Sequence, residues 1–278
     1  MSARVSLIIP TFNREEVLAA SIQDAVNSKY PDLEIIVVDQ TPTHKPQTEE
    51  FLQSVASKII WLREKCEGVA RPRNIGLRQA FGSYIIFVDD DVRFDENFVG
   101  NHVKVLDSGA DVVQGRIIEA KAGPTDRPQW MGFWIRISGS NDCPVAGPTN
   151  TITGCNFSLK RAVYDRIGGF DERFSNPAVF EDGDWGMRAY ATGFNMRYSP
   201  EPALHHLRAG TGGVDSSVTE QRLSENYYFC CFMYAYKRHH WLAVLRYTTR
   251  LYIRGAKAAI RMIRRARARA KVGIAPGF

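Results

Sequence analysis

Runs of consecutive apolar residues alternate with amphipathic stretches along the N-terminal third of the chain. Four such runs are typical of strands buried on both faces, at residues 5–10, 33–39, 59–62 and 84–88. The stretches between them predict helices, at residues 15–28, 48–57 and 68–81. The resulting β-α-β-α-β-α-β order predicts an α/β fold with a mostly parallel central sheet and right-handed crossovers.

Acidic residues stand at the ends of two of these predicted strands. Asp39 closes the second run, Asp89, Asp90 and Asp91 follow the fourth, and Pro10 closes the first. Ligands of parallel sheets lie outside the C-terminal strand ends, so we expect these residues to share a site. Three adjacent carboxylates repel one another, and their hard oxygens suit Mg²⁺ or Mn²⁺. A solvated acidic turn or a helix N-cap is the alternative interpretation of the triplet.

The net charge of +6 combines two regions of opposite sign. Twelve of the 36 Lys and Arg residues lie between Lys237 and Lys271, and no acidic residue follows Glu225. The rest of the chain holds the remaining 24 basic residues against all 30 acidic ones. The pattern therefore predicts an acidic body with a basic C-terminal arm.

The composition also argues against several classes of protein. No uninterrupted apolar run is long enough to predict a spanning helix, and no basic start followed by an apolar segment predicts a secretory signal. The five cysteines form no CxxC pair, so we interpret them as reduced thiols without a zinc site. We therefore expect a cytoplasmic protein.

Several separately spaced motifs resemble those of the family 2 glycosyltransferases, which have the GT-A fold. The similar segments are SLIIPTFNR at residues 6–14, EIIVVD at 34–39, GVARPRNIG at 68–76, DDD at 89–91, TGCNFS at 153–158, IGGFDE at 167–172 and FEDGDWGMR at 180–188. The resemblance covers the chain from Val5 to about His206. It implies a Rossmann-like, mostly parallel central sheet that is flanked by helices.

The resemblance also implies how the chain is divided. Residues 1–215 are expected to form the GT-A domain, with a nucleotide-sugar-binding half at 1–115 and an acceptor-binding half at 116–215. Residues 216–278 are expected to form a helical, basic and amphipathic C-terminal extension.

On the donor side, Asp89 and Asp91 fit the outer positions of the family's DxD motif. This implies a Mn²⁺ or Mg²⁺ ion that acts as a Lewis acid on the diphosphate of a nucleotide-diphospho-sugar. We expect Asp91 to bind the ion directly, with Asp89 nearer the ribose or a metal-bound water. Asp90 is included among the residues of the nucleotide site as their neighbour. Asp39 is expected to contact the base, although the following Gln40-Thr41-Pro42 departs from the acidic, glycine-rich turn that is commoner there.

Three further residues are assigned to the nucleotide site. Arg73 is expected to contact phosphate or to hold the DxD carboxylates, and a solvated helix-entry residue is the alternative. Pro10 and Thr11 are included because they lie at the end of the first strand.

On the acceptor side, inverting transfer to a hydroxyl needs a carboxylate that accepts the acceptor's proton. The resemblance assigns this task to Asp182, at the start of a helix whose N-terminus favours the ionised form. Glu181 is expected to orient Asp182 or to bind an acceptor hydroxyl. The alternative is that both acids only complement the helix dipole. Residues 119–150 predict a long irregular lid, whose Trp130 and Trp134 stack on sugars or anchor the loop.

Two adjacent histidines follow the predicted catalytic helix. In many relatives a histidine near this position is a metal or diphosphate ligand, and imidazole suits Mn²⁺ better than Mg²⁺. We prefer His206, with His205 as the second candidate and a surface histidine without a ligand as the alternative.

The basic arm is expected to form an amphipathic helix. Its basic residues fall within one arc of about 100° when projected at helical spacing, namely Arg246, Arg250, Arg254, Lys257, Arg261, Arg264 and Arg265. Apolar residues gather on the opposite side, namely Leu242, Leu245, Tyr252, Ala256, Ile260 and Ile263. Aromatic residues precede this helix, including Tyr227, Tyr228 and Phe229. Such a helix suits an anionic membrane surface, here the inner face of the membrane. The alternative is that the helix packs on the acidic body, of the same chain or of a second copy in a homo-oligomer. We do not expect nucleic-acid binding, because no recognition fold accompanies the arm.

Together these features predict an inverting, metal-dependent glycosyltransferase that acts on a saccharide or lipid-linked acceptor in cell-surface polysaccharide or glycolipid synthesis. The absence of a QxxRW motif favours the addition of one or a few sugars over polymerisation. Two alternatives remain open. One is a pseudoenzyme or scaffold that binds a nucleotide-sugar without turnover. The other is a sugar nucleotidyltransferase, whose basic, glycine-rich phosphate loop the N-terminal segment does not supply.

Overall fold

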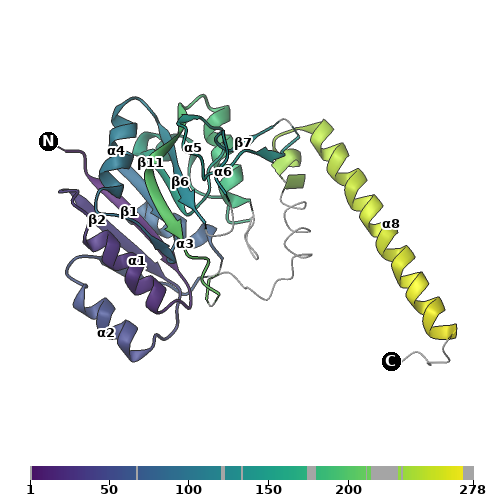
Figure 1. Ribbon diagram of the computed structural model, residues 1–278, viewed down its shortest axis with the longest axis horizontal. Coiled ribbons are helices and arrows are strands. Elements are labelled where there is room, and N and C mark those ends of the chain that lie inside the picture. The colour runs from purple at the N-terminus through teal and green to yellow at the C-terminus, as the bar shows by residue number, and fades with distance from the viewer. Residues whose placement is uncertain are drawn as a thin grey trace.

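A nine-stranded mixed sheet lies at the centre of the computed structural model, between helices on both faces (Figure 1). The structure describes residues 2–66, 68–119, 123–132, 134–173, 180–210, 212–213, 231–232 and 234–271, with side chains except at 258–259 and 261–271. The strands of this sheet are β1 (Val5–Thr11), β2 (Leu33–Asp39), β3 (Ile60–Arg63), β4 (Tyr84–Val88), β5 (Val92–Arg93), β6 (Val112–Ile118), β9 (Gly147–Pro148), β10 (Asn156–Lys160) and β11 (Met196–His206).

The four strands predicted in the N-terminal third are confirmed, and they lie in the order β3-β2-β1-β4 with all pairs parallel. Both faces of β1, β2 and β4 are buried, whereas β3, at the edge of the sheet, is only partly buried, in contrast to the prediction. Helices α1 (Glu16–Val26), α2 (Pro46–Ser54) and α4 (Phe98–Asp107) supply the core on one face. Helices α3 (Ala70–Gln79), α5 (Arg161–Ile167) and α6 (Glu181–Ala191) supply it on the other. Burial on both faces explains why β1, β2 and β4 read as continuous apolar runs.

The second half of the sheet is not parallel throughout. Strand β10 runs antiparallel between β4 and β6, while β11 lies parallel to β6. The short β5 pairs antiparallel with the end of β11, so that Val92 lies opposite His206. As a result, the C-terminal end of β11 meets the segment that follows β4, about 115 positions away in the chain.

Residues 119–150 are largely irregular where the structure describes them, as predicted. Strands β7 (Trp130–Met131) and β8 (Ile137–Ser138) form a separate two-stranded sheet. Trp130 packs edge-on against Tyr190 of α6, whereas Trp134 is 44% exposed. One of the two predicted aromatic residues therefore anchors the loop.

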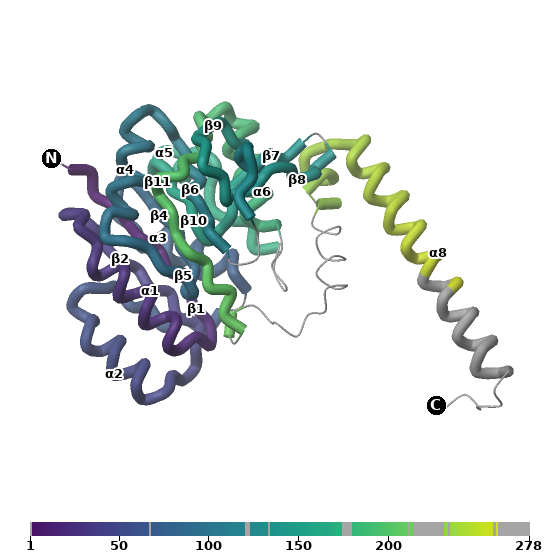
Figure 2. Tube along the Cα trace, viewed as in Figure 1, coloured from purple at the N-terminus to yellow at the C-terminus, as the bar shows by residue number. Residues whose placement is uncertain are grey.

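The predicted C-terminal helix is present as α8 (Trp241–Lys271), which projects away from the sheet (Figure 2). Its first turns pack on the loop around β7 and on the start of α6, through a cluster that includes Met131, Phe180, Ala243 and Tyr247. The aromatic residues 227–229 lie outside the described residues, as does the side chain of Ile263. Among the described helices, none combines the length and the apolar character that crossing a membrane requires.

Candidate functional site

A pocket of about 610 Å³ opens at the C-terminal ends of β1, β2 and β4. Its lining includes most of the predicted donor-site residues, namely Pro10, Thr11, Arg73, Asp89, Asp90, Asp91 and His206. The sheet topology explains this arrangement, because the carboxyl ends of neighbouring parallel strands lie at one edge.

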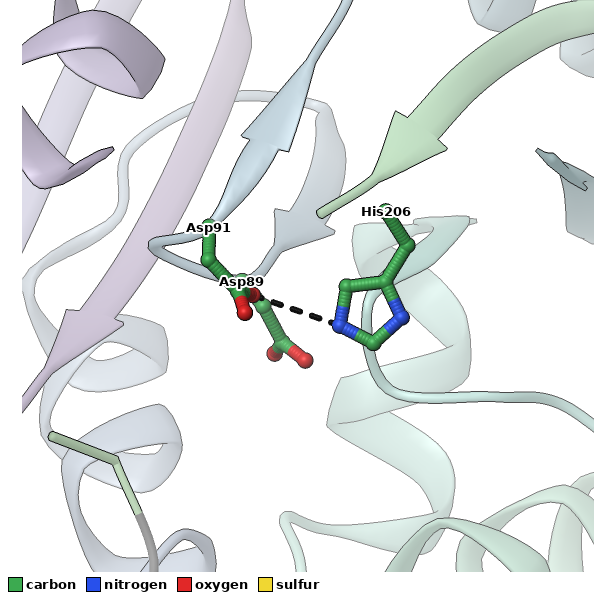
Figure 3. A group of neighbouring side chains, drawn as sticks. All are labelled: Asp89, Asp91 and His206. Carbon is green, nitrogen blue, oxygen red and sulfur yellow. Dashed lines mark ion pairs between the residues drawn. The ribbon is translucent and has the colours of Figure 1, made fainter. Parts of the chain in front are cut away.

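Asp89, Asp91 and His206 form a group that could hold a metal ion, with one ligand atom from each within 4.8 Å of the others (Figure 3). Nε2 of His206 lies 3.2 Å from Oδ1 of Asp91. Two carboxylates and one imidazole form a donor set that Mn²⁺ accepts more readily than Mg²⁺. His205 is exposed and does not belong to this group, since successive side chains of a strand alternate between faces.

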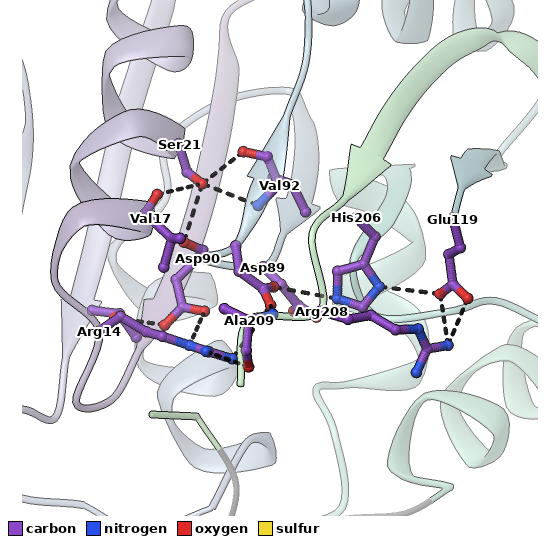
Figure 4. A network of polar contacts seen from close by, with 12 residues as sticks. Arg14, Val17, Ser21, Asp89, Asp90, Val92, Glu119, His206, Arg208 and Ala209 are labelled. Carbon is purple, nitrogen blue, oxygen red and sulfur yellow. Dashed lines mark hydrogen bonds and ion pairs between the residues drawn. The ribbon is translucent and has the colours of Figure 1, made fainter. Parts of the chain in front are cut away.

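A buried arginine, Arg14, lies beside the aspartate triplet (Figure 4). Its guanidinium lies 3.3 Å from Oδ1 of Asp90 and 3.3 Å from Oδ2 of Asp91, and it donates to the carbonyl of Ala209. Arg14 was not among the predicted site residues, although it ends the first family-like motif. The cation expected beside the triplet is thus supplied in part by the protein itself.

Asp90 and Asp91 differ in the direction in which their pKa is moved. Burial raises the pKa of Asp90 to about 7, although a 2.7 Å hydrogen bond from Thr11 and the charge of Arg14 oppose this effect. Burial acts in the same direction on Asp91, but hydrogen bonds from His206 and the backbone N–H of Ala209 lower its pKa below the usual value. Asp91 is therefore the member of this pair that is held ionised, as a metal ligand requires.

Glu119 is a further residue that sequence reasoning missed. It follows β6, and its Oε1 lies 3.2 Å from Nδ1 of His206, while both its oxygens accept from Arg208 at 2.7 Å. With Nδ1 engaged by Glu119, Nε2 of His206 faces the aspartates. Burial opposes protonation of His206, but the carboxylates of Asp91, Asp89 and Glu119 raise its pKa to about 9.

Arg73 joins the metal group to the predicted catalytic helix. This buried side chain donates to Oε1 of Glu181 at 2.8 Å and to Oδ1 of Asp89 at 3.0 Å. Gly154 lies against the guanidinium, where an added Cβ would come within 2.4 Å of Nη2. The alternative of a solvated helix-entry residue is wrong, because Arg73 is only 4% exposed.

Glu181 and Asp182 begin helix α6, as predicted. The preceding Phe180 has φ of 86°, a left-handed conformation that a bulky residue rarely adopts. The backbone N–H groups of Gly154 and Gly183 donate to the Asp182 carboxylate at 3.0 and 2.7 Å.

The pKa values of Glu181 and Asp182 are both higher than those of exposed acids. Burial raises the pKa of Asp182, against the lowering effects of the Arg73 charge and the two N–H groups. Burial and the charge of Asp182 also raise the pKa of Glu181. Burial therefore outweighs the helix N-terminus that was expected to favour ionisation.

Asp39 lies outside the pocket lining, unlike the other predicted donor-site residues. It is 1% exposed, and its carboxylate is held by His44 at 2.8 Å, by the indole N–H of Trp61 at 3.0 Å and by the N–H of Thr41 at 2.9 Å. Gln40 and Pro42 line the pocket at this position instead.

Comparison with known proteins gives a family for this chain. Residues 6–168 match the family described as Glycosyl transferase family 2. The chain belongs to this family. The matched segment runs from β1 to α5. It therefore contains Arg73 and the two aspartates of the DxD motif, Asp89 and Asp91.

The probable glycosyltransferase YdaM of Bacillus subtilis is 26% identical over 223 residues, which cover 71% of this chain and 49% of YdaM. The crystal structure of S. aureus TarS 1–349 in complex with UDP-GlcNAc matches with a TM-score of 0.63 and 18% identity, over 84% of this chain and 65% of that one. The mannosyltransferase PcManGT from Pyrobaculum calidifontis, in complex with GDP-Man and Mn²⁺, matches with a TM-score of 0.58 and 18% identity, over 86% and 65%. These likenesses confirm the expected GT-A type fold. The chain spans about half the length of YdaM.

Proposed function

We propose that this family 2 chain transfers a sugar from a nucleotide-diphospho-sugar to a saccharide or lipid-linked acceptor, with a divalent metal ion and with inversion. The observation that carries the proposal is the placing of Asp89, Asp91 and His206 in the pocket at the strand ends. The presence of UDP-GlcNAc in the TarS complex, and of GDP-Man with Mn²⁺ in the PcManGT complex, supports the same class of donor.

The donor's diphosphate fits beside the metal group. A bound divalent ion would be held by Asp89, Asp91 and His206, and it would supply Lewis-acid stabilisation of the charge that develops on the diphosphate. Arg14 and Arg73 lie at the same end of the pocket and add positive charge there. Phe12, Gln40 and Pro42 line the pocket where the base would lie, so base recognition is assigned to them rather than to Asp39.

Asp182 is proposed as the general base. It accepts the proton of the acceptor hydroxyl as that oxygen bonds to the anomeric carbon, and the bond from this carbon to the diphosphate oxygen breaks. The nucleoside diphosphate leaves with the bonding electron pair, and the configuration inverts because the hydroxyl attacks from the face opposite the diphosphate. A base with a raised pKa accepts a proton more effectively near neutral pH. Arg73, which contacts both Glu181 and Asp89, holds the start of the base's helix in place relative to the metal group.

For the product we propose only a broad class, namely cell-surface polymers. The relative TarS is described as a poly(ribitol-phosphate) β-N-acetylglucosaminyltransferase, and it is 29% identical over 92 residues, which cover 32% of this chain. We extend only the acceptor class, a surface saccharide or its lipid-linked precursor, to the present protein.

The test measures donor hydrolysis and sugar transfer over a panel of nucleotide-sugars with Mn²⁺. We expect Asp91→Ala and Asp182→Asn to lose turnover, whereas Asp165→Asn, on the exposed surface of α5, serves as the matched control and keeps it. Proton NMR of the product's anomeric centre then checks inversion.

Three outcomes contradict the proposal. Wild-type-like turnover in both variants would show that Asp91 and Asp182 do not have the roles assigned to them. Donor binding without turnover in the wild type indicates a scaffold. Formation of a sugar nucleotide from a nucleoside triphosphate and a sugar phosphate indicates a nucleotidyltransferase.

A further inference from the structure

The long helix α8 has an apolar face that no other described part of the chain covers. Ala243 and Tyr247 are buried against the loop around β7, and they fix the orientation of the helix. Apolar side chains on another side of the helix stay in solvent, with Leu242 58% exposed and Tyr252 79% exposed. We call this face the α8 stripe, and it consists of Leu242, Leu245, Tyr252, Ile253 and Ile260.

The α8 stripe is straight and long. At 100° per residue its five members fall within an arc of about 100°. From Leu242 to Ile260 the helix rises by about 27 Å. A continuous apolar face of this length differs from the single exposed apolar side chains that are ordinary on protein surfaces.

A groove of about 360 Å³ adjoins the N-terminal end of the stripe. It is lined by Trp134, Arg136, Leu242, Leu245 and Arg246, so apolar side chains and two guanidinium groups share it. Arg246 donates to the carbonyl of Trp134 at 2.7 Å and lies 5.8 Å from the centre of its ring. The groove therefore joins the stripe to the loop that the sequence assigns to the acceptor side.

Charge distinguishes the candidate occupants of this surface. No acidic residue follows Glu225, whereas Arg246 and Lys257 lie along one flank of the stripe when the helix is projected at 100° per residue. A second copy of this helix would bring like charges together, which disfavours pairing. Nucleic acid would match the positive charge of the helix but would leave the apolar stripe in water. An anionic lipid surface satisfies both features, because apolar side chains enter the acyl boundary while the cations stay among the headgroups.

We propose that the α8 stripe and the adjoining groove form a binding surface for an anionic phospholipid bilayer, with α8 lying in the plane of the interface. Leu242, Leu245 and Trp134 insert at the body end, and the guanidinium groups of Arg136 and Arg246 contact lipid phosphates. Because Ala243 and Tyr247 attach the helix to the β7 loop and to Phe180, the membrane plane is fixed relative to the start of α6. The acceptor side of the protein then faces the lipid.

The experiment measures co-sedimentation of the full chain with phosphatidylcholine vesicles that contain or lack phosphatidylglycerol. We expect binding to the anionic vesicles that weakens as salt is raised. The double variant Leu242→Gln/Leu245→Gln should weaken the partition coefficient by about tenfold or more, because two apolar side chains no longer enter the bilayer. Leu251→Gln is the matched control, since Leu251 is exposed on the opposite side of α8, and its partitioning should stay unchanged.

Several outcomes overturn the proposal. One is absence of wild-type binding to anionic vesicles, and another is equal binding by the double variant. A third is a concentration-dependent dimer in sedimentation velocity that the double variant loses while vesicles bind neither protein. Circular dichroism and thermal melts check that the exposed substitutions leave the fold intact. Vesicle binding needs no donor or metal, so this proposal and the proposed activity fail independently.

Discussion

Two pairs of carboxylates, Asp89 with Asp91 and Glu181 with Asp182, lie on either side of Arg73, and the protein environment treats them differently. Asp91, in the pair with Asp89, has its pKa lowered, since contacts from His206, Ala209 and Arg14 outweigh burial. In the Glu181–Asp182 pair, burial raises both pKa values. Acids of the same type thus become suited to two tasks, the binding of a cation and the acceptance of a proton.

The largest expected effect comes from removing the base alone. Asp182→Asn should lower kcat by roughly 10²–10⁴, because the amide cannot accept the acceptor's proton. The affinity for Mn²⁺ should stay unchanged, since Asp182 is not in the metal group. Stopped assays of product formation and Mn²⁺ titration by electron paramagnetic resonance measure the two quantities. Loss of Mn²⁺ affinity in this variant would contradict the division of tasks between the pairs.

The second-largest effect is expected from the residue that orients His206 in the metal group. Glu119→Gln should weaken Mn²⁺ binding by about 10–100-fold, because the carboxylate that holds Nδ1 of His206 is lost. Glu201→Gln is the control, since Glu201 forms an exposed pair with Lys104. Calorimetric titration of Mn²⁺ without donor gives the affinities. Equal affinities in the two variants would mean that Glu119 does not position His206.

Asp39, the carboxylate at the end of β2, should act on stability rather than on the donor. Asp39→Asn should lower the free energy of unfolding by about 1–3 kcal/mol, because it weakens the buried contacts with His44 and Trp61. The KM for the donor should change little, whereas Gln40→Ala should raise it. Urea unfolding and steady-state kinetics separate these effects. If Asp39→Asn instead raised KM strongly and left the stability unchanged, Asp39 would be a residue that recognises the base of the donor.

The smallest effect is a displacement of the pH profile. Below its raised pKa, Asp182 is protonated and cannot accept a proton, so kcat/KM should rise with pH through that pKa. The charges that face Asp182 are Arg73, which lowers its pKa, and Glu181 and Asp89. Arg73→Gln removes the lowering charge and should move the rise to higher pH, while Arg73→Lys should move it less. A profile of Arg73→Gln that moves to lower pH would contradict this assignment, provided that melting curves show both variants folded.

Much of the donor side could be predicted because it follows local rules. The strands ending at Asp39 and before Asp89 are continuous apolar runs, and parallel strands bring such ends to one edge. Hence Pro10, Thr11, Asp89, Asp90 and Asp91 were assigned to the pocket that they line. The boundaries of β2 and β4 agree with the predicted runs.

What could not be predicted depends on pairing between distant segments. Strand β10 enters antiparallel between β4 and β6, and no periodicity in its sequence shows which neighbours it takes. The contact of Glu119 with His206 follows from the parallel register of β6 and β11. Asp39 was assigned to the base because its strand-end position gave no sign that His44 and Trp61 would occupy its carboxylate.

The sequence by itself determined the α/β order, the acidic strand ends, the candidate base at the start of α6 and the amphipathic, basic character of α8. Each of these depends on residues that are close in the chain, where spacing and charge suffice. Only the tertiary structure decided that Arg14 and Glu119 contact the residues of the metal group, that Asp39 lies outside the pocket lining, and which face of α8 is exposed. These results depend on long-range packing, because burial and hydrogen-bond partners arise only when distant segments meet.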